Sequence, residues 1–269
     1  MIRALSIVAV WVLVPATCLA EPPAIVPTQK IVLFNGRDLS GLYTWLKASG
    51  RGDPNRVFSV VDGTIHVSGK GVGYIATEKA YKDYRLTVEF RWGKKTDGTG
   101  AVRNAGVLLH GTGPDGAAQG AWMTSIECQL AQGCEGDLIV IRGGGPDGKP
   151  YPATLWSETV TAADGKTRWK PGGKKTEYRG EQFWWSKHQP FFEETLDNRG
   201  RDDVASPLGQ WTRVECLCVG DRIAVSINGV PVNEARGVRP SSGKILLQCE
   251  ENEIEYRNFE IHPIPAGEK

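Results

Sequence analysis

The sequence predicts an all-β protein, a sandwich of two antiparallel sheets with one long loop insertion. Apolar and polar residues alternate along many short segments, and this period of two is typical of half-buried strands. Turn residues separate the segments at regular spacing, as they do in β-sandwiches. The chain has 33 glycines and 9 tryptophans but only 2 methionines, which agrees with a turn-rich β protein. No segment carries an amphipathic helical pattern longer than two turns.

The first twenty residues predict export. Arg3 precedes the apolar run 7–14, and the letters CLA place small residues three and one before a cut after Ala20. This is the pattern of a signal peptide over residues 1–20, and its apolar run is too short to span a bilayer comfortably. Attachment of a lipid at Cys18 is the alternative, although the residues before it fit a lipidation box poorly. We therefore expect an exported protein that is periplasmic, on the cell surface or secreted.

A Pro-rich leader, residues 21–30, and a single domain, residues 31–265, are expected to follow. The expected strands come in this order: the hairpin 57–69 with a turn at Asp62-Gly63, the strand 83–92, the strand 104–110, the strand 123–130 and its partner 136–143, the hairpin 211–232 with a turn near Gly220, and two final strands within 243–264. Alternation predicts that each strand turns one side towards a core and the other side outwards.

Between about residues 143 and 209 the alternation stops. This segment is rich in Gly, Pro, Lys, Trp and charged residues, and we expect it to hold only a few short strands. Irregular segments of this length are uncommon inside compact domains and are often functional. We expect its part from about residue 143 to 205 to lie over or beside a binding groove and to bring Trp184, Trp185 or His188 towards that groove.

Charge and cysteine content limit the classes of partner. The 32 basic and 31 acidic residues give a formal net charge of +1, which offers no electrostatic argument for nucleic acid or an anionic membrane. A zinc site is not indicated, because the chain has no CxxC motif and its four histidines are scattered. Cys128 and Cys134 bracket a short turn. Two alternatives follow from this spacing: a local disulfide between them, or two separate buried thiols.

Three blocks of sequence resemble one known family. They are IVLFNGRDLSGLYTWL at 31–46, YKDYRLTVEFRW with NAGVLLHGTG at 81–113, and the C-terminal stretch with INGVPV and GKILLQCEENEIEYRNFEIHPI. Their order and spacing are similar to those of the 3-keto-disaccharide hydrolase domain family. The resemblance implies a concanavalin A-like jelly-roll sandwich that acts on glycosides oxidised at C3 of the sugar. The sequence departs from the family at Cys249, where Ser is usual, and at His110, where many members carry Arg.

The strand 123–130 supplies the first candidate site residues. Its alternation turns Ile126, Cys128 and Leu130 to the core, so Glu127 and Gln129 face the concave sheet surface on which jelly rolls hold sugars. A Gly-rich segment expected to be mobile precedes this strand. The same rule turns Gln248, Glu250, His110 and Arg91 away from the core of their own strands.

A 3-keto glycoside would suit this set of groups. The ketone acidifies the proton on C2, so a base can remove that proton while the group on C1 leaves. Glu127 is the first candidate for the base, His110 is the alternative base or acid, and Glu250 is a third catalytic candidate. Arg91, Gln248 or a bound divalent ion would polarise the ketone, although no cofactor is certain.

The other candidate substrate-binding residues are Gln129, Trp122, Trp185 and His188, and each could instead serve packing. A one-step hydrolysis by two carboxylates is a competing mechanism. The chain lacks the closely spaced acids E-x-D-x-x-E of laminarinases, which argues against ordinary retaining glucanase chemistry. The alternative function is a non-catalytic, lectin-like carbohydrate-binding module, which would need no acid and base. Both functions imply a carbohydrate partner.

Overall fold

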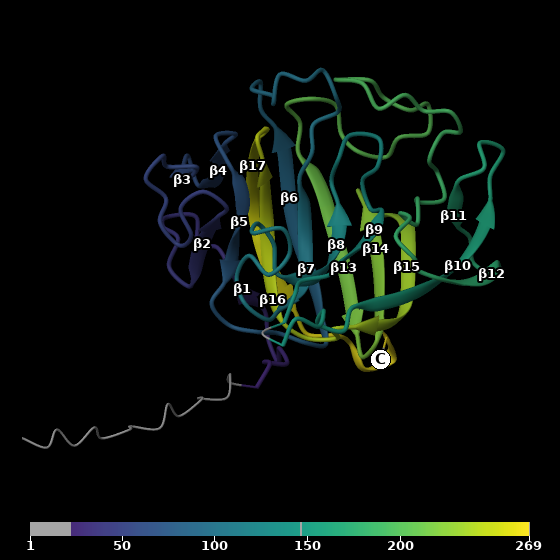
Figure 1. Cartoon of the computed structure of the whole chain (residues 1–269), viewed down its shortest axis with the longest axis horizontal. Coiled ribbons are helices and arrows are strands. Elements are labelled where there is room, and N and C mark those ends of the chain that lie inside the picture. The colour runs from purple at the N-terminus through teal and green to yellow at the C-terminus, as the bar shows by residue number, and fades with distance from the viewer. Residues whose placement is uncertain (1–22, 146, 269) are drawn as a thin grey trace, which may run out of the picture.

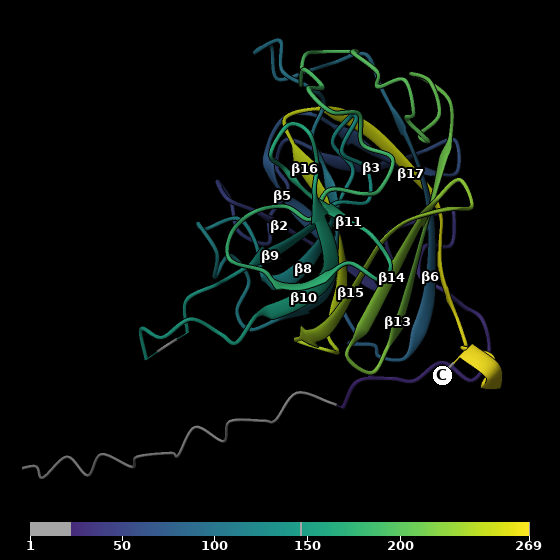
Figure 2. The ribbon, with the colours of Figure 1, turned by 90° about the vertical axis from the view of Figure 1, so that its right-hand side faces the viewer.

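In the computed structural model of the chain, residues 23–145 and 147–268 are described, and they form two antiparallel β-sheets packed face to face (Figures 1 and 2). The all-β, jelly-roll sandwich predicted from the sequence is therefore confirmed. The expected signal peptide, residues 1–20, lies outside the described residues. Within the described ranges, no helix is long and apolar enough to cross a membrane.

The larger sheet has eleven strands, with a main order β11-β10-β15-β14-β13-β6-β17-β4-β3. Its remaining strands are β1, which pairs with β17, and β12, which pairs with β10. The strands are β1 (Ile31–Val32), β3 (Phe58–Val61), β4 (Thr64–Ser68), β6 (Tyr84–Trp92), β10 (Thr154–Thr161), β11 (Thr167–Trp169), β12 (Lys174–Glu177), β13 (Thr212–Val219), β14 (Arg222–Ile227), β15 (Val230–Arg239) and β17 (Glu253–His262).

The smaller sheet has six strands in the order β2-β5-β16-β7-β8-β9. They are β2 (Leu42–Leu46), β5 (Val72–Thr77), β7 (Gly106–Thr112), β8 (Thr124–Gln129), β9 (Leu138–Ile141) and β16 (Lys244–Glu250). A short 3-10 helix, η1 (Ala266–Glu268), follows the last strand. The final two strands of the sequence lie in different sheets, so the chain crosses the sandwich at the turn after Glu250.

Two tight turns show why the hairpins form where the sequence predicts them. Asp62 and Gly63 have φ values of 48° and 77°, and Asn228 and Gly229 have 49° and 79°. Positive φ at both central residues defines the type I′ turn, which matches the twist of paired strands and favours Asn-Gly and Asp-Gly. The two turns therefore connect β3 to β4 and β14 to β15.

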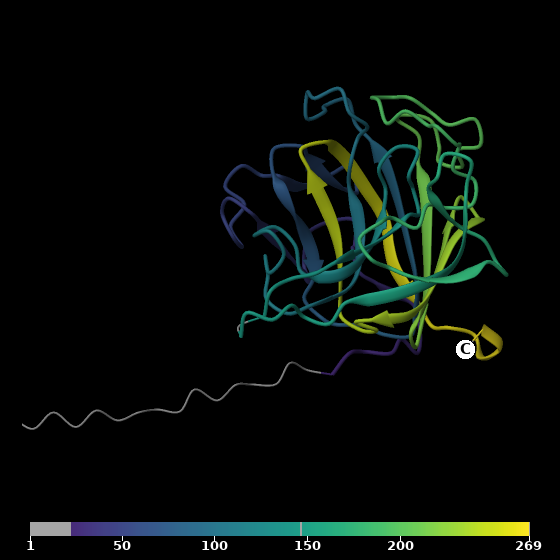
Figure 3. The same ribbon diagram turned by 45° about the vertical axis from the view of Figure 1, so that its right-hand side comes forward.

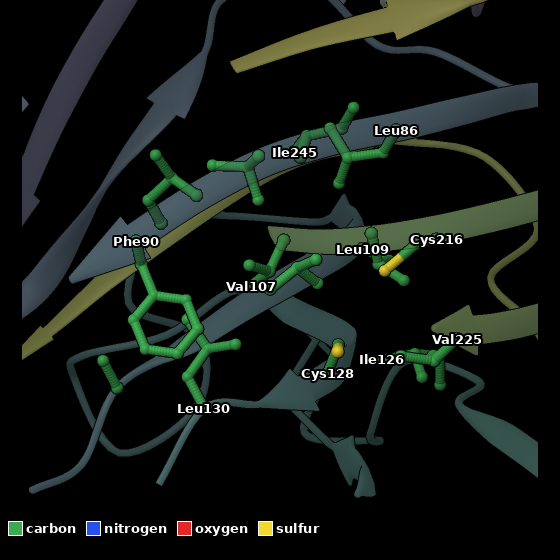
Figure 4. Packing of buried hydrophobic residues seen from close by; sticks show 14 of the residues in the cluster. Leu86, Phe90, Val107, Leu109, Ile126, Cys128, Leu130, Cys216, Val225 and Ile245 are labelled. Carbon is green, nitrogen blue, oxygen red and sulfur yellow. The ribbon is translucent and has the colours of Figure 1, made fainter. Parts of the chain in front are cut away.

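The core fills the space between the two sheets (Figure 4). Leu86 and Phe90 of β6 project from one sheet, and Val107, Ile126 and Cys128 project from the other. All of these side chains are fully buried or nearly so. The inward half of each predicted alternation thus forms the core, and the outward half of the smaller sheet is left for other contacts.

The insertion is more regular than the sequence indicates. It contains β10, β11 and β12, which extend the larger sheet beyond β15. The alternation of β10 is hard to read because two of its buried positions are polar, Ser157 and Thr159. Farther along, Phe183 bridges Leu138 of the edge strand β9 and covers that edge. The last part of the insertion, residues 186–209, forms loops at one end of the sandwich, drawn in green at the top of Figure 3.

All five cysteines of the described chain are buried free thiols. Cys128 points into the core towards Cys216 (Figure 4), whereas Cys134 lies beyond the end of β8 with its Sγ 3.7 Å from His188 Nε2. The local disulfide between Cys128 and Cys134, left open from the sequence, is therefore wrong. Strand alternation turns Cys128 into the core, whereas Cys134 lies in the turn after β8 and faces His188.

Candidate functional site

Carboxyl and amide side chains gather on the outer face of the smaller sheet. Ile126 and Cys128 of β8 enter the core, and so do Leu247 and Cys249 of β16. The residues between them, Glu127 and Gln248, therefore leave the core on the opposite face, and Glu250 and Gln129 follow by the same alternation. Strand β7 lies between β8 and β16, so it separates these two groups by a single strand.

Gly106 of β7 allows the two groups to meet. It pairs directly with Gln129, and a side chain at this position would collide with the carboxyl of Glu127 and the amide of Gln248. Because Gly106 has no side chain, both of these longer side chains reach over β7 towards each other. A glycine inside a strand often marks such a close approach.

Burial sets the protonation of Glu127 and Glu250, which we call the carboxyl pair. Burial raises the pKa of Glu127 to about 8, with a further increase from the charge of Glu250 and a smaller opposing effect of Gln248. Burial also raises the pKa of Glu250 to about 7, against a hydrogen bond that Asn104 Nδ2 donates to its carboxylate. Because the charge of Glu250 also raises the pKa of Glu127, the state in which both carboxyls are ionised is disfavoured.

Two buried acceptors beside the carboxyl pair have no partner. They are Gln248 Oε1 and Asn104 Oδ1. Buried polar atoms are normally hydrogen-bonded, and exceptions are often found at functional sites. These two oxygens could each accept a hydrogen bond from a hydroxyl group of a bound molecule.

Sequence reasoning missed Asn104 and Gly106 as parts of the site. The available signal was the triplet Asn-Ala-Gly that leads into β7, which puts an amide and a glycine two residues apart on the same outward-facing row. Neither residue carries a group that suggests acid or base chemistry by itself. Their contribution depends on which strands lie beside β7, and the order of strands in the sheet was not predicted.

The Gly-rich segment before β8 is anchored, although its composition predicted mobility. Tyr43 and Tyr74 each donate a hydrogen bond of 2.7 Å to Asp115 Oδ1, and Arg51 binds Asp115 Oδ2 at 2.9 Å. Trp45 Nε1 donates to the carbonyl of Gly120 at 3.1 Å. Residues 113–122, which we call the anchored loop, thus cover the outer face of β2 and β5.

Besides Gln248, two of the predicted binding residues lie on this outer face. Trp122 packs at the end of the anchored loop in a cluster that includes Leu108 and Leu246. Leu108 pairs with Glu127, so this cluster borders the carboxyl pair. Gln129 uses its Oε1 to accept hydrogen bonds from the backbone of Leu130 and Ala131, at 2.8 and 3.0 Å, which leaves its amide nitrogen for other contacts.

The predicted position of His110 is wrong. The register of β7 against β8 shifts between Leu109 and Thr112, and His110 has a φ of 59°, so the simple alternation ends before this residue. The ring lies between the sheets, 5.8 Å from the ring of Tyr84, and Nδ1 donates to the carbonyl of Pro240 at 2.9 Å. Burial lowers the pKa of His110 to about 4, so the imidazole is neutral and lies away from the carboxyl pair.

Three other predicted residues also lie elsewhere. Arg91 belongs to β6 of the larger sheet, where it pairs with Glu255 and lies over the ring of Trp211. Trp185 is part of the main core, and its backbone N–H donates to Asp137. His188 is buried in the insertion, with its ring 3.6 Å from that of Trp184. The insertion therefore uses these aromatic groups for its own packing, contrary to the expectation that it brings them to the groove.

The metal ion considered from the sequence would need a set of ligands. In the part of the chain that the structure describes, no group of three or more His, Cys, Asp or Glu side chains is arranged to hold one. The face around the carboxyl pair offers two carboxyl groups and the amides of Asn104, Gln129 and Gln248. These groups suit proton transfer and hydrogen bonding to hydroxyl groups.

Comparison with known proteins agrees with the fold. The sequence profile of the 3-keto-alpha-glucoside-1,2-lyase-like domain matches residues 29–262. A candidate glycosyl hydrolase from Parabacteroides distasonis ATCC 8503 has a TM-score of 0.51 at 18% identity, covering 88% of this chain and 94% of its own. This likeness shows a shared fold.

Two further structures are similar at lower scores. A second candidate glycosyl hydrolase from Parabacteroides distasonis ATCC 8503 has a TM-score of 0.48 at 18% identity, covering 88% of this chain and 100% of its own. Carbohydrate-binding module CBM66 from Bacillus subtilis has a TM-score of 0.45 at 11% identity, covering 82% and 94%. No curated protein matches the chain in sequence.

Proposed function

We propose that this chain, which belongs to the 3-keto-alpha-glucoside-1,2-lyase-like domain family, cleaves a 3-keto glycoside between C1 and its substituent. The observation that carries the proposal is the carboxyl pair, two acids on one sheet face whose pKa values are both raised by burial. A general base and a general acid are needed at the same time, and one ionised and one protonated carboxyl supply both.

The reaction begins at C2, which the neighbouring ketone makes acidic. The base takes the C2 proton, the electrons of that C–H bond form a C1=C2 double bond, and the C1–O bond breaks. The acid gives its proton to the departing oxygen, so the leaving group departs as an alcohol. Addition of water across the double bond then completes a net hydrolysis.

Glu250 is the better base and Glu127 the better acid of the carboxyl pair. The hydrogen bond from Asn104 stabilises the ionised form of Glu250, whereas the charge of Glu250 favours the protonated form of Glu127. The sequence alone favoured Glu127 as the base and His110 as the alternative. The hydrogen bond from Asn104 to Glu250 reverses the role expected for Glu127, and the burial of His110 leaves Glu250 for the other role.

The amides complete the proposed site. Proton abstraction puts negative charge on the ketone oxygen, and amide N–H groups can stabilise that charge. Gln248 and Gln129 lie on the same face as the carboxyl pair and carry such donors. The unpartnered oxygens of Gln248 and Asn104 would accept hydrogen bonds from sugar hydroxyls.

The test is turnover of 3-keto-glucosides and 3-keto-trehalose, with and without a chelator, by the parent protein and two variants. Glu250→Gln should stop both cleavage and exchange of the C2 hydrogen in D2O. Glu127→Gln should slow cleavage by about a hundred- to ten-thousand-fold but retain exchange, because the base is intact. Cleavage by the parent protein without any C2 exchange would point to direct hydrolysis, and saturable binding without turnover would point to a carbohydrate-binding module.

We also propose that the reaction takes place outside the cytoplasm, on the basis of the expected signal peptide. Sequencing the N-terminus of the protein purified from the host envelope should give Glu21 as the first residue. A lipid-modified Cys18 would contradict this assignment.

A further inference from the structure

A hollow on the surface of the insertion, which we call the insertion groove, lies apart from the carboxyl pair. Its volume is about 750 Å³, within the range typical of ligand sites, about 300 to 1,000 Å³. Its walls come from the end of β10, from β11 and from residues 186–190, and Val230 of β15 also lines it. None of these segments belongs to β7, β8 or β16, and Figure 1 shows β11 at the opposite end of the molecule from β2.

Hydrogen bonds between neighbouring walls hold the insertion groove in shape. Arg168 Nε donates to the carbonyl of His188 at 3.2 Å, which ties β11 to the facing segment. Asp164 pairs with the same guanidinium at 2.8 Å, so the charge of Arg168 is already balanced. The backbone N–H of Ser186 donates to the carbonyl of Val232 in β15 at 3.2 Å. The groove is therefore formed in the free protein, and a preformed site loses less conformational freedom on binding.

Part of the lining of the insertion groove is apolar and open to solvent. Val160 of β10 is 38% exposed, and Trp169 of β11 and Val230 of β15 are only partly covered. All three line the groove. Apolar groups that gather at an accessible surface often mark a binding site, and an indole ring presents a flat apolar face. A ligand in the groove can therefore contact these side chains without any rearrangement of the protein.

The charged groups of the insertion groove leave it positively charged. Lys170 of β11 and Lys187 of the insertion are both exposed and line the groove from two walls. Among the residues that the structure describes, neither lysine has an ion-pair partner of its own. Asp202 also lines the groove, but Arg201 binds its carboxylate at 3.0 Å and lowers its pKa, with a smaller contribution from Lys187. The two lysines are thus available to a negatively charged ligand.

These groups match a ligand that carries negative charge and both apolar and polar surfaces. A pyranose ring can turn its C–H groups towards Trp169 while its hydroxyl groups bond to Ser186 and Asp202 at the rim. A carboxylate on the sugar would form a charge-assisted hydrogen bond with Lys170 or Lys187. The volume equals that of about 25 water molecules at about 30 Å³ each, which leaves room for more than one sugar unit. A fatty acid suits the groove less well, because its chain would remain exposed to water there.

We propose that the insertion groove binds a short oligosaccharide that carries carboxylate groups, such as an oligouronate. Trp169 supplies the ring against which one sugar unit packs. Lys170 and Lys187 bind carboxylates of the chain from the two walls, and Val160 and Val230 contact its C–H groups. The inference does not depend on the proposed lyase reaction, because none of these residues belongs to that site.

Saturation-transfer NMR of the full chain with tetragalacturonate tests the proposal, with the neutral cellotetraose and sodium decanoate as separate comparison probes. Tetragalacturonate should bind with a Kd of about 1 mM or below at low salt, and cellotetraose at least about tenfold more weakly. Lys170→Gln and Lys187→Gln should each weaken the binding of tetragalacturonate about two- to fivefold, as expected for exposed ion pairs. Trp169→Leu should weaken the binding of both tetrasaccharides, because it removes the flat ring and no charge.

Lys79→Gln is the matched control, because Lys79 is an exposed lysine that follows β5 and lies outside the insertion groove. It removes the same charge and should leave the binding of tetragalacturonate unchanged. The lysine variants replace exposed side chains, so their Tm should equal that of the parent protein. This measurement separates a loss of binding from a loss of folding.

Four results would overturn the proposal. The first is no saturable binding of tetragalacturonate, and the second is equal binding of tetragalacturonate and cellotetraose, since the groove would then not recognise charge. The third is tighter binding of decanoate, weakened by Lys170→Gln, which would assign the groove to an apolar acid. The fourth is an equal loss of binding in Lys79→Gln and the two groove variants, which would show attraction to the general surface charge rather than to this groove.

Discussion

Replacing Glu127 by Gln should make the folded protein more stable at high pH and leave it almost unchanged at low pH. The pKa of Glu127 is about 8 in the folded chain against an ordinary value of 4.5. Because the folded-state pKa is raised, the associated stability is fully present below pH 4.5 and is lost as the pH rises through 8. A neutral Gln of the same shape does not ionise and so escapes this loss.

The size of the effect follows from the two pKa values. Each pH unit between them is worth about 1.4 kcal/mol, so ionising this buried carboxyl costs the folded state at most about 5 kcal/mol. Local rearrangement and water entry reduce that cost, and we expect a gain of about 2 to 5 kcal/mol for Glu127→Gln at pH 9. For a domain of this size the gain corresponds to a rise in Tm of about 5 to 15 °C. The unpartnered Gln248 Oε1 can accept a hydrogen bond from the new amide.

Thermal unfolding of parent and variant at pH 5, 7 and 9 measures the effect directly. The difference in Tm should be small at pH 5 and should grow at each step. Glu89→Gln is the control, because Glu89 pairs with Arg257 on the outer side of the larger sheet, and its Tm difference should be the same at pH 5 and 9. If Glu127→Gln also shows a constant difference, Glu127 is not a buried acid with a raised pKa, and the assignment of the carboxyl pair fails.

Three further changes test other parts of the structure. Gly106→Ala should retain the fold at an overpacking cost of about 1 to 3 kcal/mol. It should lower turnover of a 3-keto glucoside at least about tenfold, because the new methyl group displaces Glu127 and Gln248. Full activity of this variant would contradict the contact of these two side chains over β7. His110→Phe should reduce the stability that the protein loses as the pH falls from 6.5 to 4. Burial lowers the pKa of His110, so the folded state holds the imidazole neutral while the unfolded state takes up a proton. Tm measured against pH for parent and variant tests this, and parallel curves would argue against the buried position. Asp115→Asn should speed proteolysis within the anchored loop, because it weakens the bonds that Tyr43, Tyr74 and Arg51 make with residue 115. An unchanged rate of cleavage would show that other contacts hold the loop.

The sequence predicted the strands better than it predicted which side chains meet. Alternation alone was enough to turn Glu127 and Gln248 outwards, because both strands are regular and one face of each enters the core. It failed at His110, where the shifted register and a positive φ reverse the side. Gly111 follows directly, but a single glycine does not show on which side of it the register shifts. Alternation also gave no position for Arg91 relative to Glu127, because the assignment of a strand to one sheet or the other depends on long-range pairing.

The insertion shows a second reason for failure. Its aromatic residues looked like sugar-stacking groups because the segment lacks strand periodicity. In the structure Trp185 joins the main core and His188 lies against Trp184, so these rings stabilise the segment itself. A long insertion must bury apolar surface of its own to be ordered, and composition cannot separate that need from ligand binding.

The rate at which the buried thiols react with a reagent measures how often each region of the folded chain unfolds. Because Cys128, Cys134, Cys216, Cys218 and Cys249 are all covered, an alkylating reagent can reach them only during local or global unfolding. Labelling followed by peptide mass analysis would therefore time the exposure of different regions in one experiment. Cys134 reports on the contact of the insertion with the end of β8, while Cys128 and Cys216 report on the separation of the two sheets. The ratio of these labelling rates would show whether the insertion detaches while the sandwich stays closed.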